Sequence, residues 1–413
     1  MPTKLFRNIS YLGLSQIANY LFPLITIPYI TRVVGPENFG YIELAAAVML
    51  YLVVLVDYSF NTTATGRIAV LKEEGKPIAP LFSAVMAAKA LLLLLAAALL
   101  LLITSAVDSL RAQQALLWLA FPLVVGWILY PNFLLYGVQK LGVVALANFL
   151  IKGLAAGFIF WLINQPDHYR WVPFINGISQ VGVGGAALLY VLYYLPGIRF
   201  IRVSWAAVGA VLREGRQIFV SNLLARVYSL SALVMGGLVL PPLQLGIFAA
   251  ASKLITVGQS FLFQPLHGAL FPFFSALHQR DAQQYRRRHR RGLWLLAGAT
   301  LAASLGLYFF APWLVPLIFG EGFQATIPLL QTMAPMLFVG SFAHMHLQQG
   351  LLIVKKYRSY LWVIFWASLW SVLGGWWLIN QFGAAGAAQT RLITESLLAL
   401  LATGFFYKYR RPA

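Results

Sequence analysis

The sequence predicts an all-α integral membrane protein with about twelve transmembrane helices. Two observations predict it. Hydrophobic residues make up 60% of the 413 residues and charged residues only 10%, with a mean hydropathy of +0.77, whereas a soluble domain has about 25% charged residues. The apolar residues also recur in stretches of about 20, the length that a helix needs to cross the hydrocarbon core.

The candidate spans are separated by short polar turns. They are residues 9–30, 41–63, 80–104, 114–136, 142–164, 171–195, 217–240, 245–275, 292–311, 326–353, 359–380 and 384–406. Prolines interrupt two of them, 245–275 at Pro265 and Pro272, and 326–353 at Pro328 and Pro335, so these two are the least regular. An even number of spans puts both termini on one side of the membrane.

Basic residues in the loops predict which side that is. Nearly all loop Lys and Arg lie on the side of the termini, including RRRHRR at 286–291, and only Arg32, Arg111 and Arg170 lie on the other. Positive charge collects in cytoplasmic loops, so both termini are expected in the cytoplasm. The formal net charge of +19 is therefore expected to set topology and contact anionic lipid, and no nucleic-acid partner is expected.

The spans divide into two sets of six. We expect an N-terminal lobe over residues 1–195, a cytoplasmic amphipathic linker over 196–216, and a C-terminal lobe over 217–413. PENFGYIELAAAV at 36–48 resembles PLQLGIFAAASKL at 242–254. Six spans per half predict a parallel pseudo-two-fold repeat around a V-shaped central cavity, which is a transporter architecture.

Charged residues inside the spans are the candidate functional groups. Each costs about 2.5–3.5 kcal/mol near the bilayer centre unless it pairs, reaches the interface or lines a wet cavity. The cations are Lys89, Lys152, Arg226, Lys253 and Arg391, and the anions are Glu43, Asp57 and Glu395. Lys89 is expected to be an interfacial anchor. The excess of cations predicts a positive interior that suits an anionic substrate.

Helical spacing relates several of these residues. Glu43 and Asp57 are almost four turns apart, so they share a face about 21 Å long. Asn61 follows Asp57 by one turn, and Lys152 follows Asn148 by one turn.

Two pairings stay open at this point. Asp57 could serve a function with Asn61, or it could pair with Arg67 at the cytoplasmic end of its helix. Arg391 and Glu395 have the same four-residue spacing, which fits either a structural ion pair or a cavity site.

Several chemistries are excluded. The chain has no cysteine, so it has no disulfide or thiolate metal site. Its histidines form no HxxxH or HExxH pair, and no GxxxxGK[ST] loop is present, so no metal, cofactor or ATP site is expected.

Three stretches resemble a known family. NISYLGLSQIANYLFPLITIPYITRVVGPENFG at 8–40, LVDYSFNTTATGRIA at 55–69 and PNFLLYGVQKLGVVALANF at 131–149 are similar to O-antigen polysaccharide flippases. These are the Wzx-type members of the multidrug/oligosaccharidyl-lipid/polysaccharide exporter superfamily. Gly66 before Arg67 departs from that pattern, since such proteins more often have an acidic or larger residue two steps on.

The resemblance implies a multi-pass protein of the bacterial inner membrane that moves oligosaccharides on undecaprenyl pyrophosphate to the periplasmic leaflet. No bond is made or broken, so no catalytic residue is expected. The expected partners are this lipid-linked sugar, membrane lipids, an H+ or Na+ gradient, and other membrane proteins of polysaccharide assembly. The expected substrate-binding residues are Arg32, Lys152, Arg226, Lys253, Arg391, Asn61 and Asn148. The expected ion-coupling or cation-pairing residues are Asp57, Glu43 and Glu395.

Two other functions compete with this one. A small-molecule or multidrug exporter of the same superfamily would need an acidic cavity, against the excess of interior cations. A membrane-embedded polysaccharide polymerase or glycosyltransferase would need a sizeable outward loop, and the outward loops here are short.

Overall fold

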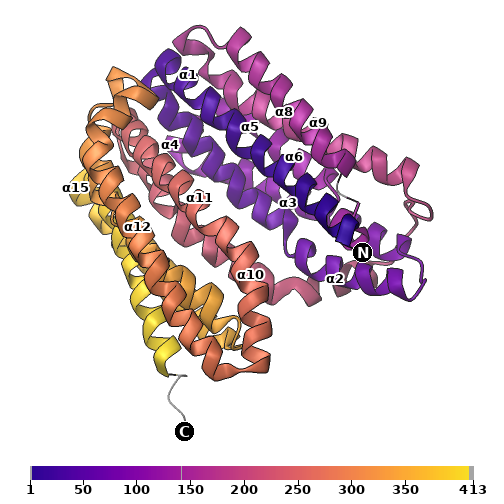
Figure 1. The fold of residues 1–413 in the computed structure, drawn as a ribbon. Coiled ribbons are helices and arrows are strands. Elements are labelled where there is room, and N and C mark those ends of the chain that lie inside the picture. The colour runs from indigo at the N-terminus through magenta and orange to yellow at the C-terminus, as the bar shows by residue number, and fades with distance from the viewer. Residues whose placement is uncertain (1, 141, 409–413) are drawn as a thin grey trace. The chain divides into compact units, whose positions relative to one another are not determined.

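The computed structural model describes the backbone of residues 2–140 and 142–408, and the side chains from Asn19 on, residue 20 excepted. All regular structure in these residues is helical (Figure 1), which confirms the predicted fold class. In chain order the helices are α1 (Pro2–Asp57), α2 (Phe60–Glu73), α3 (Ala79–Ala106), α4 (Asp108–Arg111), α5 (Gln114–Ala120), α6 (Pro122–Leu129), α7 (Asn132–Val138), α8 (Gly142–Leu162), η1 (Pro166–Arg170), α9 (Trp171–Tyr194), α10 (Trp205–Val239), α11 (Pro242–Arg280), α12 (Ala282–Phe319), η2 (Glu321–Phe323), α13 (Thr326–Met333), α14 (Met336–Ala343), η3 (His344–Leu351) and α15 (Tyr357–Lys408).

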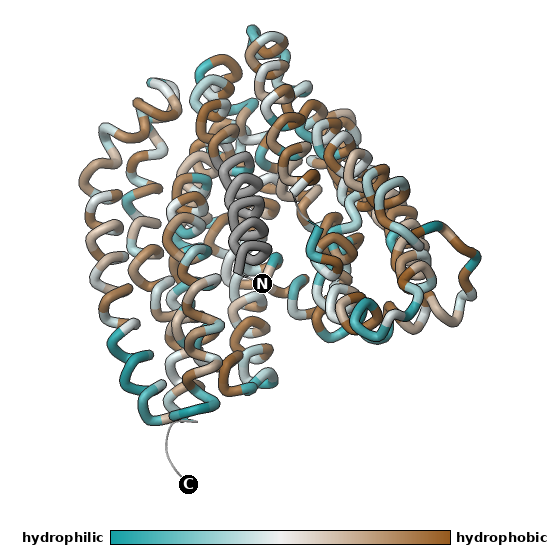
Figure 2. The backbone as a smooth tube through the Cα atoms, turned by 45° about the vertical axis from the view of Figure 1, so that its right-hand side comes forward, coloured by the Kyte–Doolittle hydropathy of each residue, from teal (hydrophilic) through white to brown (hydrophobic). Residues whose placement is uncertain are grey.

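Ten helical stretches of the described residues are long and apolar enough to cross a membrane. Figure 2 shows hydrophobic residues along most of their length. Two of the ten contain a glycine with non-helical angles, Gly35 (φ 75°, ψ 173°) in α1 and Gly383 (φ 60°, ψ −134°) in α15. These positive φ angles suit glycine. Both glycines lie where the sequence predicts a boundary between spans, and the count of twelve stays a prediction.

The predicted span 41–63 is wrong as a single helix. Helix α1 ends at Asp57, Tyr58 adopts a left-handed φ of 54°, and α2 begins at Phe60. The Tyr58 ring stacks on Phe219 with centroids 4.4 Å apart. A strained backbone of this kind persists where surrounding contacts hold it, and a contact so distant in sequence is invisible to periodicity.

Prolines also divide the span predicted at 114–136. It consists of α5, α6 and α7, with Pro122 at the start of α6 and Pro131 directly before α7. Pro335 likewise separates α13 from α14, as expected. Pro265 and Pro272, by contrast, lie within the continuous α11.

The chain divides into two compact units, unit 1 up to Leu223 and unit 2 from Leu224, with the boundary inside α10. Residues 196–204 are not helical, and α10 begins at Trp205. Its first turns bury Val208, Val211 and Gly215, and expose Glu214. The role of residues 196–216 as a linker, the exact lobe bounds, the parallel repeat and the V-shaped cavity stay predictions.

Small residues allow close helix packing in unit 1. Helices α6 and α9 lie against each other, and a Cβ on Gly184 would lie 2.3 Å from the carbonyl oxygen of Gly126. Since that distance is shorter than any real contact, the pair requires glycine at position 184. Helix α1 packs on α3, α6 and α8 in the same unit.

In unit 2, α11, α14 and η3 pack on α15, and α12 packs on α11 and α14. One apolar cluster joins η3 and α15 through Leu351, Val363 and Ala402. A second joins α11, α12 and η3 through Phe274 and Met345. The polar side chains of unit 2 described below come from these same helices.

Candidate functional site

Lys89 lies within α3 and is completely buried. Its ammonium is 3.9 Å from the carboxylate of Asp57. It also donates hydrogen bonds to the carbonyl oxygens of Trp127 at 3.1 Å and Tyr130 at 3.3 Å. These carbonyls lie at the C-terminal end of α6, where helical partners are lacking. The expectation that Lys89 is an interfacial anchor is therefore wrong.

Asp57 ends α1 and shares its charge between two partners. The Nδ2 atom of Asn61 lies 2.9 Å from each carboxylate oxygen, and the Lys89 ammonium lies 3.9 Å from one of them. The alternative pairing with Arg67 is wrong, because Arg67 Nη1 lies 2.9 Å from Glu214 of α10.

Polar groups surround this pair where α2 meets α7. The hydroxyl of Thr65 donates to the carbonyl oxygens of Asn61 at 2.8 Å and Phe133 at 3.1 Å. The Oδ1 atoms of Asn61 and Asn132 are buried and have no hydrogen-bond partner. Buried oxygens of this kind indicate a place for water or a ligand's donor. We call Asp57, Asn61, Lys89 and Asn132 the Asp57 cluster.

Lys152 belongs to a different contact. Its Nζ donates to Asn19 Oδ1 at 2.6 Å, which joins α8 to α1. Asn148 is buried one turn earlier on α8. Glu43 is half-buried and Arg32 is exposed.

Two predicted residues, Arg391 and Glu395, come together in unit 2. Arg391 of α15 donates a hydrogen bond to Ser252 of α11. Glu395 hydrogen bonds with Gln259 and is attracted by the Arg391 charge. Because Glu395 lies one turn beyond Arg391, the two form the core of one polar site.

Tyr228 of α10 extends this site. It interacts electrostatically with Glu395, Arg391 and Arg226, although the Arg226 side chain is exposed. Lys253 is half-buried and follows Ser252 directly. We call Arg391, Glu395 and their partners Ser252, Gln259 and Tyr228 the Arg391 cluster.

A group of histidines in unit 2 escaped prediction. The hydroxyl of Thr403 lies 2.9 Å from His346 Nδ1. His289 Nε2 lies 3.0 Å from the carbonyl oxygen of Met345. The rings of His289 and His346 lie 5.7 Å apart and both contact Phe406. The distribution of histidines in the sequence was a usable signal. The chain has six histidines, and all except His168 lie in the last 150 or so residues.

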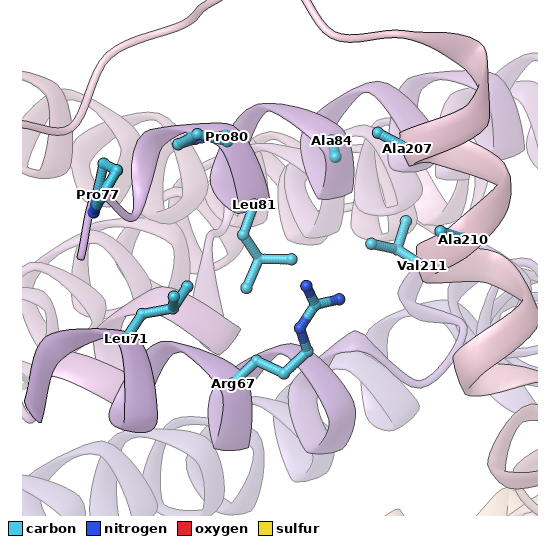
Figure 3. Close-up of a pocket in the computed structure, with 9 residues that line it drawn as sticks. All are labelled: Arg67, Leu71, Pro77, Pro80, Leu81, Ala84, Ala207, Ala210 and Val211. Carbon is cyan, nitrogen blue, oxygen red and sulfur yellow. The ribbon is translucent and has the colours of Figure 1, made fainter. Parts of the chain in front are cut away.

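A pocket of about 280 Å³ lies in unit 1 between α2, α3 and the start of α10 (Figure 3). Its walls are apolar, with Leu81 and Val211 facing each other. Arg67 lies at the bottom of the view, and its guanidinium group points into the pocket. Arg67 also pairs with Glu214, so the positive charge at this wall of the pocket is neutralised by the Glu214 carboxylate.

Comparison with known proteins identifies relatives along the whole chain. Residues 5–278 match the family described as polysaccharide biosynthesis protein. A protein of Escherichia coli strain K12 named "Putative O-antigen transporter" is 28% identical over 398 residues, 96% of this chain and 95% of that protein. A Shigella dysenteriae protein of the same name is 24% identical over 403 residues, 95% of this chain and 98% of that protein.

Solved structures share the fold. An inward-facing multidrug resistance MATE family transporter of the MOP superfamily has a TM-score of 0.76 at 16% identity, with 97% of this chain and 98% of that chain covered. The lipid II flippase MurJ in an inward closed conformation has a TM-score of 0.72 at 12% identity, with 96% and 87% covered. The fold is that of MOP superfamily transporters.

These matches confirm the resemblance that residues 8–40, 55–69 and 131–149 indicated. The family match covers more than half of the 413 residues. The chain therefore belongs to the polysaccharide biosynthesis protein family.

Proposed function

We propose that this protein is a flippase for lipid-linked oligosaccharides of surface polysaccharide synthesis, and that it works by alternating access. The observation that carries the proposal is the match along nearly the whole chain to a protein named as an O-antigen transporter, within a family of polysaccharide biosynthesis proteins. The flippase MurJ has the same fold.

The proposed substrate is an undecaprenyl-pyrophosphate-linked repeat unit. Its pyrophosphate needs cationic partners. The contacts of each cation inside the spans favour some of these residues over others. Lys89 already pairs with Asp57 and donates to two carbonyl oxygens, so it is a poor candidate for binding the pyrophosphate. Arg391 and Arg226 both act on Tyr228 of the Arg391 cluster, and Lys253 follows Ser252 directly in α11. Guanidinium groups bind phosphate oxygens in a bidentate manner, so Arg226 and Arg391 are the strongest candidates.

The proposed driving force is an H+ or Na+ gradient. Asp57 and Glu395 are acids inside helices that cross or approach the membrane core, each with a cation nearby. Binding of a coupling cation to such an acid would compete with its pairing to Lys89 or Arg391. This exchange can link ion occupancy to conformation at Asp57, because its pair with Lys89 joins α1 to α3. At Glu395 the link runs through Arg391, whose hydrogen bond to Ser252 joins α15 to α11.

The proposed direction is from the cytoplasmic to the periplasmic leaflet, with both chain termini in the cytoplasm. The distribution of loop charges supports this orientation. Cysteine scanning is simple here because the natural chain has no cysteine. Single cysteines at Arg213 and Arg111 should react with a membrane-impermeant maleimide from opposite sides.

Complementation of a bacterial strain that lacks its O-antigen flippase tests the function. Expression should restore surface polysaccharide and remove the lipid-linked repeat units that accumulate inside the cell. Arg391→Ala and Arg226→Ala should fail while reaching the membrane in normal amounts, and Arg213→Ala should succeed. Failure with every repeat unit tested would overturn the proposal, and resistance to cationic drugs instead would indicate a small-molecule exporter.

A further inference from the structure

All histidines of the chain except His168 belong to unit 2. They come from α11, α12 and η3, and they are His267, His278, His289, His344 and His346. His289 and His346 are fully buried, and the other three are half-buried. Polar rings are costly to bury in an apolar helical core unless they are hydrogen-bonded.

The rings form a series that begins at the basic turn between α11 and α12. His278 contacts Tyr285 with ring centroids 5.0 Å apart. Tyr285 contacts His289 at 5.6 Å, and His289 contacts His346 at 5.7 Å. The charge of Arg286 acts on His278, which places the start of the series beside the RRRHRR sequence.

The π-helix η3 continues the series. The hydroxyl of Tyr285 donates to the carbonyl oxygen of Gln349 at 2.7 Å. The side chain of Gln349 lies 3.3 Å from His267 Nδ1, and the His267 ring contacts His344 at 6.0 Å. In an α-helix, residues 344 and 349 would point about 140° apart. The i to i+5 bonding of a π-helix brings both to the same face, and so both reach His267.

The far end of the series lies beside Glu395. The His344 ring stacks on Phe263 with centroids 5.1 Å apart. Gly340 of α14 has no side chain, and a Cβ there would lie 3.1 Å from Glu395 Oε1 and 3.2 Å from the Phe263 ring. Glu395 Oε1 and the Phe263 ring, on which His344 stacks, therefore both lie against the bare Cα of Gly340.

Polar atoms along the series are left without partners. His344 Nε2, Gln349 Oε1 and His278 Nδ1 are buried and make no hydrogen bond. Buried polar atoms without protein partners are places where bridging water binds. Metal binding does not explain the histidines, because within the described ranges no three His, Asp or Glu side chains converge on a possible ion position.

We propose that these histidines form a proton route between the basic end of unit 2 and Glu395. Imidazole accepts a proton on one nitrogen and releases the proton from the other, so each ring ends the transfer neutral and turned to its second tautomer. Bridging water carries the proton between rings. The Glu395 carboxylate accepts the proton and becomes a neutral carboxylic acid. The route identifies H+ as the coupling ion, and only that assignment rests on the proposed function.

Charged and titratable neighbours set the conditions of the route. Arg286 faces His278, Tyr407 contacts His346, and Arg391 and Tyr228 act on Glu395. Protonation of Glu395 removes its attraction for Arg391 and frees that guanidinium group. Protonation of Glu395 and release of the Arg391 guanidinium group for phosphate binding would then occur together.

Infrared spectroscopy of the purified full chain after a light-triggered pH drop tests the route without any sugar substrate. A protonated carboxyl band should appear and be absent in Glu395→Gln. His344→Gln and His267→Gln should each slow its appearance by about tenfold or more, with the pH midpoint unchanged. Free imidazole should restore the rate in His344→Ala.

His168→Gln is the matched control, since His168 lies in unit 1 against the Leu162 carbonyl, and it should leave the rate unchanged. If one glutamine variant does not fold, the other decides the result. Wild-type rates in the folded glutamine variants, or equal slowing in His168→Gln, would overturn the route. An intact route in a protein that fails complementation would refute the proposed flippase function alone.

Discussion

The Lys89 ammonium, fully buried in α3, lies 3.9 Å from the Asp57 carboxylate, which is 22% exposed. Removal of one partner of a buried pair destabilises a protein by about 3–5 kcal/mol, because the other charge stays buried. Lys89→Met should therefore lower the unfolding temperature strongly. The double variant Asp57→Asn/Lys89→Met should be more stable than Lys89→Met alone.

The measurement is thermal unfolding of the detergent-purified protein, followed by tryptophan fluorescence. The matched control is Lys140→Met, since Lys140 is exposed, and its unfolding temperature should stay near wild type. Additive effects of the two cluster substitutions would show that the pair is not coupled.

Loss of the carboxylate charge should abolish transport. Asp57→Asn can still hydrogen bond with Asn61 but loses the negative charge that attracts a cation, and Glu43→Gln removes the other proposed coupling acid of α1. Each variant should reach the membrane but fail to complement a flippase-deficient strain. The control is Glu214→Gln, an exposed acid, which should complement. Full transport by the Asp57→Asn/Glu43→Gln double variant would refute ion coupling at these acids.

Adjacent glycines in α9 should tolerate a methyl group very differently. A Cβ on Gly184 would overlap the Gly126 carbonyl oxygen at 2.3 Å, whereas a Cβ on Gly185 meets nothing within 4 Å. Gly184→Ala should separate α6 from α9 and destabilise unit 1 by about 1–3 kcal/mol. Gly185→Ala should be neutral or slightly stabilising. Equal unfolding temperatures for the two variants would contradict the packing described.

The Arg67–Glu214 ion pair should contribute little to stability. Its side chains are 47% and 41% exposed, and exposed pairs contribute about 0.2–1 kcal/mol. Glu214→Gln should shift the unfolding temperature slightly, and the shift should fade in high salt. The reversed pair Arg67→Glu/Glu214→Arg should recover any loss at low salt, and a large loss that persists in high salt would mean that Glu214 has another role.

Composition was enough to predict the all-α membrane fold, because an apolar stretch of about 20 residues without charges is expected to cross the membrane as a helix. Gly35 and Gly383 also lie where turn signals indicated boundaries. The break at Tyr58–Ser59 could not be predicted, since it depends on stacking against Phe219. Nothing in the sequence next to Tyr58 indicates that its backbone is left-handed.

The candidate sites were predictable in part. Spacing of four residues related Asp57 to Asn61, and this hydrogen bond is present even though a helix break separates the residues. Lys89 was misassigned because its partner is on another helix. Its depth was a usable signal, since ten residues into α3 correspond to about 15 Å, too far for easy snorkelling.

The π-helix η3 places residues 344 and 349 on one face by fitting an extra residue into each turn. Removal of Gln348 would return the segment to α-helical register, with the apolar face of α14 and the start of α15 nearly undisturbed. Chains of this family that lack one residue between positions 344 and 349 should keep these two positions on one face, because residues four apart in an α-helix point about 40° from each other. A one-residue gap in an alignment would therefore leave the polar face of this segment unchanged, and loss of His344 or Gln349 itself would mark the members that lack the route.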